Sequence, residues 1–282
     1  MTSVLFTIHE KLASFSNAEQ KIGRYILNHT HAVIQMSTAE LAAAADVSTA
    51  TVARFGKTLI PDGGYPALKL RLSAECNVDQ SLYDEINPQD DLTAVKSKLA
   101  LRLTHTIEET NASLDDASLV QASQLIAEKD NVYVYGLGAS NVAATDFEQK
   151  FIRVGKAVIH SQDTHLLAVG LTTQRKTAVL FLVSNSGEKA ESLELARLAH
   201  SMGVPIIVLT RNAGSTLGKL ATIVLVNDDS EEGQTARAAA TTSLMAQLYV
   251  IDLLYYTFIA NDYDHHIEQL VLSRDAIRKH FN

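Results

Sequence analysis

The stretch Thr177–Ala196, TAVLFLVSNSGEKAESLELA, decides the fold of this 282-residue chain. Its apolar run, 179–183, is uninterrupted, as is typical of a parallel strand covered on both faces. Small polar residues (SNSG, 184–187) follow it, and an amphipathic helix is expected to begin near Glu188. Because free N–H groups at a helix start would face the carboxyl end of the strand, the stretch predicts an anion site.

From Asn131 onward, short apolar runs alternate with helical segments. Such alternation is typical of a parallel sheet with helices on both faces, so we predict an α/β doubly wound domain with a five-stranded, mostly parallel sheet. The expected strands span residues 132–135, 157–160, 178–183, 206–209 and 223–226. Two further helices, 238–260 and 263–280, are expected after the last strand.

A second polar loop, GLGASN (136–141), follows the first expected strand. It departs from a dinucleotide fingerprint because Asn141 stands where the third Gly belongs and because HSQ (160–162), rather than an acid, ends the next strand. We therefore predict no nicotinamide or flavin, and no other cofactor. Ser140 instead offers a hydroxyl at a helix start, as Ser184 does.

Either loop alone is more typical of a structural Gly turn with a Ser cap. Two such loops at neighbouring strand ends favour one shared site for a dianionic group. The expected effector-binding residues are Gly138, Ser140, Ser184, Asn185, Ser186, Gly187 and Lys189.

The first part of the chain is predicted to be all-α. Apolar residues at helical spacing indicate helices at 4–13 and 17–27, the second capped by Asn17. A capping box formed by Ser37 and Glu40 opens the short helix TAELAAAA, and the turn 46–48 leads into a second helix, STATVARFGKTL. This order of elements is that of a helix-turn-helix.

In a helix-turn-helix, the first turn of the second helix meets base edges, and later turns meet phosphates. The expected DNA-binding residues are Ser48, Thr49, Ala50, Thr51, Arg54 and Lys57, with Val52 and Phe55 facing the core. The alternative is an ordinary helical bundle with a solvated basic face. Asp46 differs from the commonest form of the turn, which has Gly there.

The net charge of −8 argues against a general polyanion binder, but it is unevenly spread. Residues 1–77 hold seven Lys or Arg against six acidic residues, a net +1, so the other 205 residues carry −9. Between Ser48 and Arg71, four basic residues are opposed by Asp62 alone. A small module with one basic face on an acidic body suits local contact with DNA.

Composition and sequence pattern also argue against a disulfide-linked, metal-binding, membrane-spanning or secreted protein. The single cysteine, Cys76, rules out an internal disulfide, and the ten His lack metal-ligand spacing, so no metal site is expected. No apolar run reaches the length of a membrane span, and MTSVLFTIHEK at the N-terminus lacks the pattern of a signal peptide. We expect a cytoplasmic protein.

A polar linker at 77–91 is expected to divide the chain. It follows a helix predicted at 67–74. It precedes helices at 92–107 and from Asp115 or Asp116 to Ile126, which we assign to the entry of the C-terminal domain. The expected domains are therefore a helix-turn-helix domain at 1–77, a linker and connecting helix at 78–113, and the α/β domain at 114–282.

The first 75 or so residues resemble the helix-turn-helix domain of the RpiR family of bacterial transcription regulators, through NAEQKIGRYILNH, MSTAELAAAADVSTATVARF and GYPALKLRL. Residues 131–258 resemble the accompanying sugar isomerase, or SIS, phosphosugar-binding domain, through YGLGAS, RVGKAV, the Asp163/His165 region, SNSGEKAE, GVPIIVLT and SLMAQLYVIDLLY. The resemblance implies a regulator of carbohydrate metabolism genes, with its binding to a DNA operator controlled by a phosphorylated sugar. Because one recognition helix reads few base pairs, we expect a dimer or tetramer on an inverted repeat.

Three features depart from the usual family pattern: Lys189 replaces a Thr, Leu244 replaces an Arg, and LIPDGGY lengthens the connection after the recognition helix. The same domain also serves sugar-phosphate isomerases and lyases, which is the alternative function. Such enzymes need a base near the sugar carbons. The candidates for that base are Glu188, Glu191, Glu231, Glu232 and His265. The attached DNA-reading module favours a sensor, so we expect no enzyme.

Overall fold

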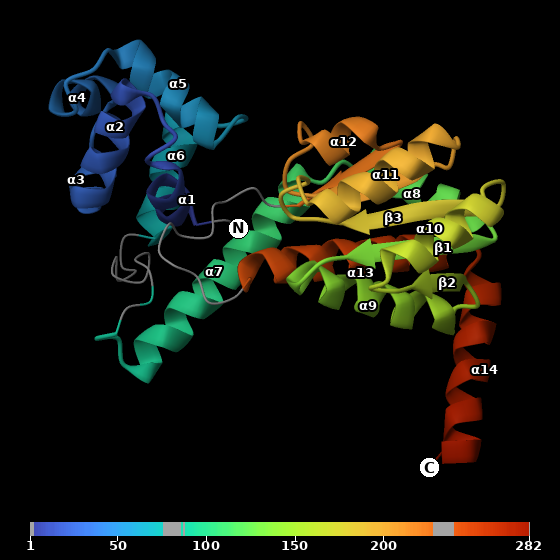
Figure 1. The fold of residues 1–282 in the computed structure, drawn as a ribbon. Coiled ribbons are helices and arrows are strands. Elements are labelled where there is room, and N and C mark those ends of the chain that lie inside the picture. The colour runs from blue at the N-terminus through green and yellow to red at the C-terminus, as the bar shows by residue number, and fades with distance from the viewer. Residues whose placement is uncertain (1–2, 76–85, 87, 228–239, 282) are drawn as a thin grey trace. The chain divides into compact units, whose positions relative to one another are not determined.

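The structure is a computed structural model that describes residues 3–75, 86, 88–227 and 240–281. These residues form two compact units, one ending at Glu108 and one beginning at Glu109. The described part of the first unit is helical, and the second unit is built on a sheet covered by helices (Figure 1). The predicted order of an all-α domain followed by an α/β domain is confirmed.

In its described residues, the first unit packs six helices and most of a seventh around one core, in which Ile8, Ile22, Leu41, Phe55 and Leu68 are fully buried. The helices are α1 (Val4–Lys11), α2 (Asn17–Asn28), α3 (Thr30–Val33), α4 (Thr38–Ala44), α5 (Thr49–Leu59), α6 (Gly64–Glu75) and α7 (Leu92–Ser113).

Two of these helices begin differently from the prediction. Asn17 was predicted to cap α2, but the cap is Ser16, whose backbone N–H donates to the Glu19 carboxylate at 3.0 Å in a capping box. Helix α6 begins at Gly64, three residues before the predicted start. Gly56 on α5 allows this early start because a side chain there would meet the backbone of Tyr65.

The connecting helix α7 is longer than predicted, and its residues up to Glu108 belong to the first unit. The Phe6 ring on α1 meets the His105 ring edge-on at 4.4 Å, and the Arg102 guanidinium lies 3.4 Å from the Glu10 carboxylate. These contacts explain why most of this helix lies with the first unit rather than at the entry of the second. The predicted linker lies mostly outside the described residues.

The second unit has a five-stranded sheet of order β2-β1-β3-β4-β5, in which every neighbouring pair is parallel. The strands are β1 (Asn131–Gly136), β2 (Ala157–His160), β3 (Ala178–Val183), β4 (Ile206–Thr210) and β5 (Ile223–Val226). All six residues of β3 are buried, which is the reason for its unbroken apolar sequence. The predicted doubly wound sheet is confirmed.

Helices cover both faces of this sheet (Figure 1). The core on one face is built with α8, α9 and α13, and the core on the other face with α10, α11 and α12. The bounds are α8 (Asp116–Glu128), α9 (Ala139–Arg153), α10 (Thr164–Thr173), α11 (Ala190–Ser201), α12 (Thr216–Leu220), α13 (Thr242–Asn261) and α14 (Tyr263–Phe281). Asp115 caps α8, as one of the two predicted alternatives proposed.

Helix α13 is long and apolar enough to cross a membrane by length and composition, and it is the one such helix among the described residues. It packs against α8 and α9, and it buries Val250, Ile251 and Leu254 completely in the core of the second unit. Its packing in this core accounts for its apolar composition.

Candidate functional site

The strand order places a reversal of the chain's winding at the carboxyl ends of β1 and β3, and we call this region the crevice. The chain leaves β1 toward β2 on one side and continues from β3 toward β4 on the other, so the two central strands flank the point where the winding reverses. Open α/β sheets bind ligands at such a point. Gly136 is in register with Val183, so the polar loops after the two strands begin side by side, as predicted.

The loop after β1 presents a hydroxyl that already has a partner. Gly138 adopts a φ of 62° and precedes the first turn of α9, where the Ser140 side chain is almost completely buried. The Ser140 hydroxyl accepts a hydrogen bond of 3.2 Å from the side-chain amide of Gln247 on α13. Gln247 was missed from the sequence, although a single amide in the apolar run SLMAQLYVIDLLY is a signal that could have found it.

The loop after β3 presents a buried hydroxyl without a partner. The Ser184 side chain is 3% exposed, and its Oγ has no hydrogen-bond partner among the described residues. Its backbone N–H donates to the carbonyl of Leu209 on β4 at 3.0 Å, which fixes the residue against the sheet. Leaving a buried hydroxyl unpaired costs about 1 to 3 kcal/mol, so a hydrogen-bond acceptor placed beside Ser184 would remove this cost.

The rest of the β3 loop is fixed by hydrogen bonds to its neighbours. The carbonyl of Asn185 accepts from the backbone N–H of Arg211 and from the Thr210 hydroxyl, each at 3.1 Å. The Ser186 hydroxyl accepts from the backbone N–H of Glu188 at 3.3 Å. Both residues are half-buried.

Gly187 and Glu188 dock this loop on the start of α12. Gly187 has a φ of 68°, and a Cβ there would collide with the Ser215 side chain, so glycine is required. The Glu188 carboxylate accepts from the backbone N–H of Thr216 at 2.8 Å. Hydrogen bonds from Thr216 lower the pKa of Glu188 from its ordinary value.

This docking corrects the predicted start of the following helix. Helix α11 begins at Ala190 rather than near Glu188, because Glu188 turns toward α12 and Lys189 has an extended backbone at the N-cap position. The exposed side chain of Lys189 therefore lies at the start of α11, beside the loop.

The structure also bears on the carboxylates considered for an enzyme. Glu188 is engaged with the backbone N–H of Thr216, the first residue of α12, and Glu191 is exposed on the first turn of α11. Glu231 and Glu232 lie outside the described residues. His265 is exposed on α14. In the part of the chain that the structure describes, no group of three or more His, Cys, Asp or Glu is arranged to hold a metal ion.

A histidine network at the end of β2 was not expected from the sequence. One ring nitrogen of His160 lies 3.1 Å from the Glu148 carboxylate, and the other lies 3.0 Å from the side-chain oxygen of Asn141. Both partners are on α9, so the network ties the end of β2 to the helix that carries Ser140.

In the first unit, α4 and α5 are joined as the helix-turn-helix prediction requires. Ser37 and Glu40 form the predicted capping box, with hydrogen bonds of 2.7 and 3.2 Å. Asp46 adopts the left-handed conformation, with a φ of 53°, and pairs with Lys21 at 2.6 Å. Ser48 caps α5 by accepting from the backbone N–H of Thr51 at 3.1 Å.

The two faces of α5 are separated clearly. Val52 and Phe55 are fully buried, as predicted. The predicted DNA-facing residues are exposed, with the exception of Thr51, which is half-buried and has its hydroxyl 2.8 Å from that of Ser48. The exposed residues are Ser48, Thr49, Ala50, Arg54 and Lys57, and Ala53, which the sequence analysis omitted, shares this face.

A shallow hollow of about 400 Å³ opens beside this exposed face. It is formed where the start of α4, the second half of α5 and the turn before α6 meet. Its lining residues are Thr38, Ala53, Lys57, Pro61, Asp62, Gly63, Gly64, Tyr65 and Pro66.

Comparison with known proteins matches both units to families. Residues 2–78 match the helix-turn-helix domain of the rpiR family, and residues 125–256 match the SIS domain. The chain is 32% identical over 262 residues to the HTH-type transcriptional regulator YbbH of Bacillus subtilis, covering 93% of this chain and 92% of YbbH. It is 30% identical over 253 residues to the HTH-type transcriptional regulator HexR of Escherichia coli, covering 89% and 86%.

A solved structure has the same fold over nearly the whole chain. The Vibrio vulnificus NanR protein, complexed with ManNAc-6P, superposes with a TM-score of 0.61 at 24% identity and covers 98% of each chain. A helix-turn-helix beside a SIS domain, in a chain this similar to YbbH and HexR, identifies the class of protein. The chain belongs to the rpiR family of helix-turn-helix transcriptional regulators that carry a SIS domain.

Proposed function

We propose that this regulator binds an inverted-repeat DNA operator through α5 and that a phosphorylated sugar in the crevice between β1 and β3 controls this binding. It acts in the cytoplasm on genes of carbohydrate metabolism. The observation that carries the proposal is the Ser184 hydroxyl, which is buried at the crevice and has no partner among the described residues. A phosphate oxygen is a strong acceptor for such a donor.

The donors around Ser184 suit a dianion. Ser140 lies on the neighbouring loop, and the backbone of Ser186 and Gly187 turns at the edge of the crevice. Lys189 adds a positive charge nearby. Hydrogen bonds to a charged acceptor contribute about 1.5 to 3 kcal/mol each, so a few of them suffice for specific binding of a phosphate. The complex of NanR with ManNAc-6P supports a sugar phosphate as the ligand class.

We propose regulation rather than catalysis at this crevice. A sugar-phosphate isomerase needs a base close to the sugar carbons, and such a base works best with a pKa near the working pH. The candidate in the β3 loop itself, Glu188, has instead a lowered pKa and is engaged with the start of α12. It therefore serves to fix the loop.

The exposed face of α5 supports the DNA part of the proposal. Thr49 and Ala50 stand at the first turn, where side chains meet base edges, and Arg54 and Lys57 follow toward phosphates. Thr51 also contacts a base if its hydroxyl gives up the hydrogen bond to the Ser48 hydroxyl and bonds a base edge instead. Two-fold symmetry doubles these few contacts, so we propose a homodimer or a dimer of dimers with half-sites an integral number of turns apart.

Ligand screening tests the proposal directly. A thermal-shift panel of sugar phosphates should contain a compound that stabilises the protein, since a ligand at about a hundred times its dissociation constant adds about 2.7 kcal/mol. Calorimetry should then give no binding of the same sugar without its phosphate, and footprinting should give two related half-sites that respond to the phosphosugar. Equal affinity for both sugar forms would mean that the phosphate does not occupy the crevice. Turnover of the sugar would mean that the protein is an enzyme.

A further inference from the structure

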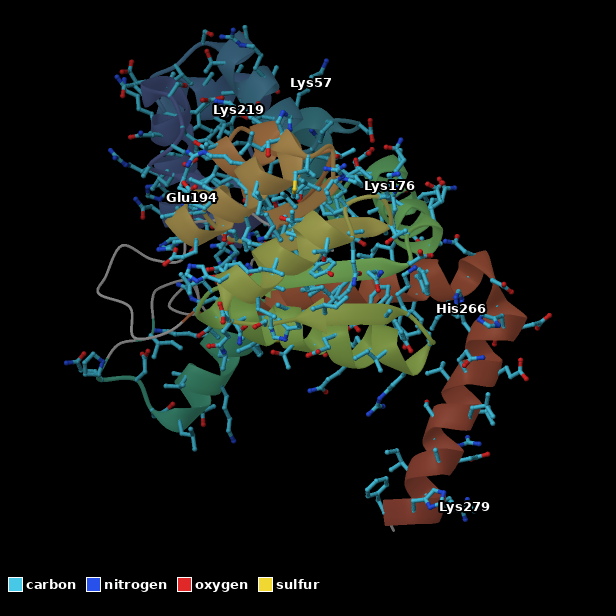
Figure 2. The ribbon with its side chains drawn as sticks, turned by 45° about the vertical axis from the view of Figure 1, so that its right-hand side comes forward. Lys57, Lys176, Glu194, Lys219, His266 and Lys279 are labelled. Carbon is cyan, nitrogen blue, oxygen red and sulfur yellow. The ribbon has the colours of Figure 1, made fainter. Side chains whose placement is uncertain are left out.

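The last helix of the chain, α14, continues far beyond the body of its unit. Its first half packs against α13 and α9, with Ile267 and Leu270 against the core and the His266 ring tilted against that of Phe258, with ring centroids 4.5 Å apart. Figure 1 shows the second half extending away from the sheet, and Figure 2 shows His266 beside the body of the unit and Lys279 near the far end. We call residues 271–281 the C-terminal arm.

The apolar face of α14 does not stop where the body ends. At about 100° per residue, His266, Leu270, Ile277 and Phe281 fall within about 60° of one another around the helix. The first two are buried or partly buried in the core, whereas Ile277 is 56% and Phe281 78% exposed. The same stripe that holds α14 to its own unit is thus carried outward along the arm with its large apolar side chains uncovered.

Charge distinguishes the arm from the body of its unit. The arm carries Arg274, Arg278 and Lys279 against Asp275, a net charge of +2. The rest of the unit, 109–229 with 235–270, holds 17 Asp or Glu against 11 Lys or Arg, a net charge of −6. A basic arm with an apolar stripe is complementary to an acidic body, and two basic arms repel each other.

We propose that the C-terminal arm packs against the body of the second unit of another copy of this chain, with the partner's arm returned in the same way. The Ile277 and Phe281 side chains supply the apolar contact, and Arg278 and Lys279 supply the attraction to the acidic body. Reciprocal exchange makes the contact isologous and closes it as a dimer.

The decisive experiment compares two sets of variants that remove equally exposed apolar groups from opposite sides of α14. Ile277→Ser with Phe281→Ser removes the stripe, while Leu272→Ser removes a side chain that is also 56% exposed but points about 150° away from it. Light scattering and sedimentation should give a dimer or a larger assembly for the unaltered chain and for Leu272→Ser. The double variant should dissociate at least a hundredfold more readily, because each dimer loses both apolar side chains twice.

Charge reversal tests whether the arm meets a body or another arm. Arg278→Glu with Lys279→Glu should weaken the dimer if the arm lies on an acidic body, and a tighter dimer would mean that arms meet each other and overturn the proposal. Circular dichroism and thermal unfolding establish that every variant keeps its fold, because the altered side chains are exposed in the single chain.

Two further results would overturn the proposal. One is that the unaltered chain remains monomeric at about 100 μM. This holds even if the monomer sediments with vesicles of anionic lipid. The other is an assembly of equal mass and stability in all variants. Mass is measured without DNA or sugar, so either failure leaves the effector proposal standing on its own test.

Discussion

The outer face of α5 and the crevice between β1 and β3 both present donors suited to phosphate, but they do so at opposite extremes of exposure. Arg54 and Lys57 stand in solvent on a helix, whereas Ser184 is buried and Ser140 nearly so. Exposed cations attract any phosphate over the range of a Debye length and are screened by salt. Buried hydroxyls act only on a group that fits between them. The first arrangement suits a long polyanion, and the second suits one small dianion.

The largest effect is expected when the crevice loses its hydroxyls. Ser140→Ala with Ser184→Ala should weaken the phosphosugar by about a hundredfold or more, because two hydrogen bonds to a charged acceptor disappear. Operator binding should be unchanged and should no longer respond to the effector. Ser201→Ala, which alters an exposed hydroxyl on α11, is the matched control. If calorimetry gives the double variant an unchanged affinity for the phosphosugar, the two hydroxyls do not bind the phosphate, and the contrast between the two regions does not hold.

A smaller effect, which unlike the first depends on salt, is expected on α5. Arg54→Ala should weaken operator and unrelated DNA alike by on the order of tenfold and lower the slope of log affinity against log salt by about 1, because one phosphate contact is lost. Phosphosugar binding should vary little with salt. Arg24→Ala, an exposed arginine on α2, is the control and should leave the slope unchanged. An Arg54 variant with the parental slope would exclude Arg54 from the phosphate-contacting face.

The difference between these regions also separates what the sequence could predict from what it could not. Local signals were sufficient for β3, for the Ser37 capping box and for the left-handed Asp46, because each depends on residues close in the chain. The hydrogen bond from Gln247 to Ser140 joins residues 107 positions apart, and the lack of a partner for Ser184 within the described part of the chain depends on what surrounds it in three dimensions. Neither could be derived from spacing.

The helix starts that were predicted wrongly have the same cause. Glu188 had the composition of a first helical turn, but the backbone N–H of Thr216, 28 residues further on, takes its carboxylate. Ser16 and Asn17 are both good caps, and the reciprocal bond from Glu19 decides between them. Where two local choices are close in energy, a tertiary or reciprocal contact selects one.

The turn before α5 provides a test in which only stability should change. Asp46→Ala should destabilise the first unit by about 1 to 2 kcal/mol, because alanine at a φ of 53° is strained. Asp46→Gly loses the same exposed pair with Lys21 but relieves the strain, so it should cost much less. Denaturant unfolding measures both. If the two variants are equally destabilised, the ion pair rather than the backbone conformation matters at this turn.

The smallest effect concerns the hydrogen bond from the Thr216 backbone N–H to Glu188, and its sign follows from the lowered pKa of this carboxylate. Hydrogen bonds from Thr216 favour the charged form in the folded state, so the folded pKa lies below the ordinary value of 4.5. The stability that the ionised Glu188 carboxylate contributes is therefore fully present above pH 4.5, and it is lost as the pH falls through the pKa of Glu188 in the folded state. Glu188→Gln cannot ionise, so the melting temperature of the unaltered chain should exceed that of the variant at pH 7, and the difference should shrink in acid.

Glu19, Glu40, Asp46 and Asp115 also have lowered pKa values, but they are present in both proteins and cancel in the difference. A difference that stays constant from pH 7 to pH 3 would mean that Glu188 holds the loop by its shape alone.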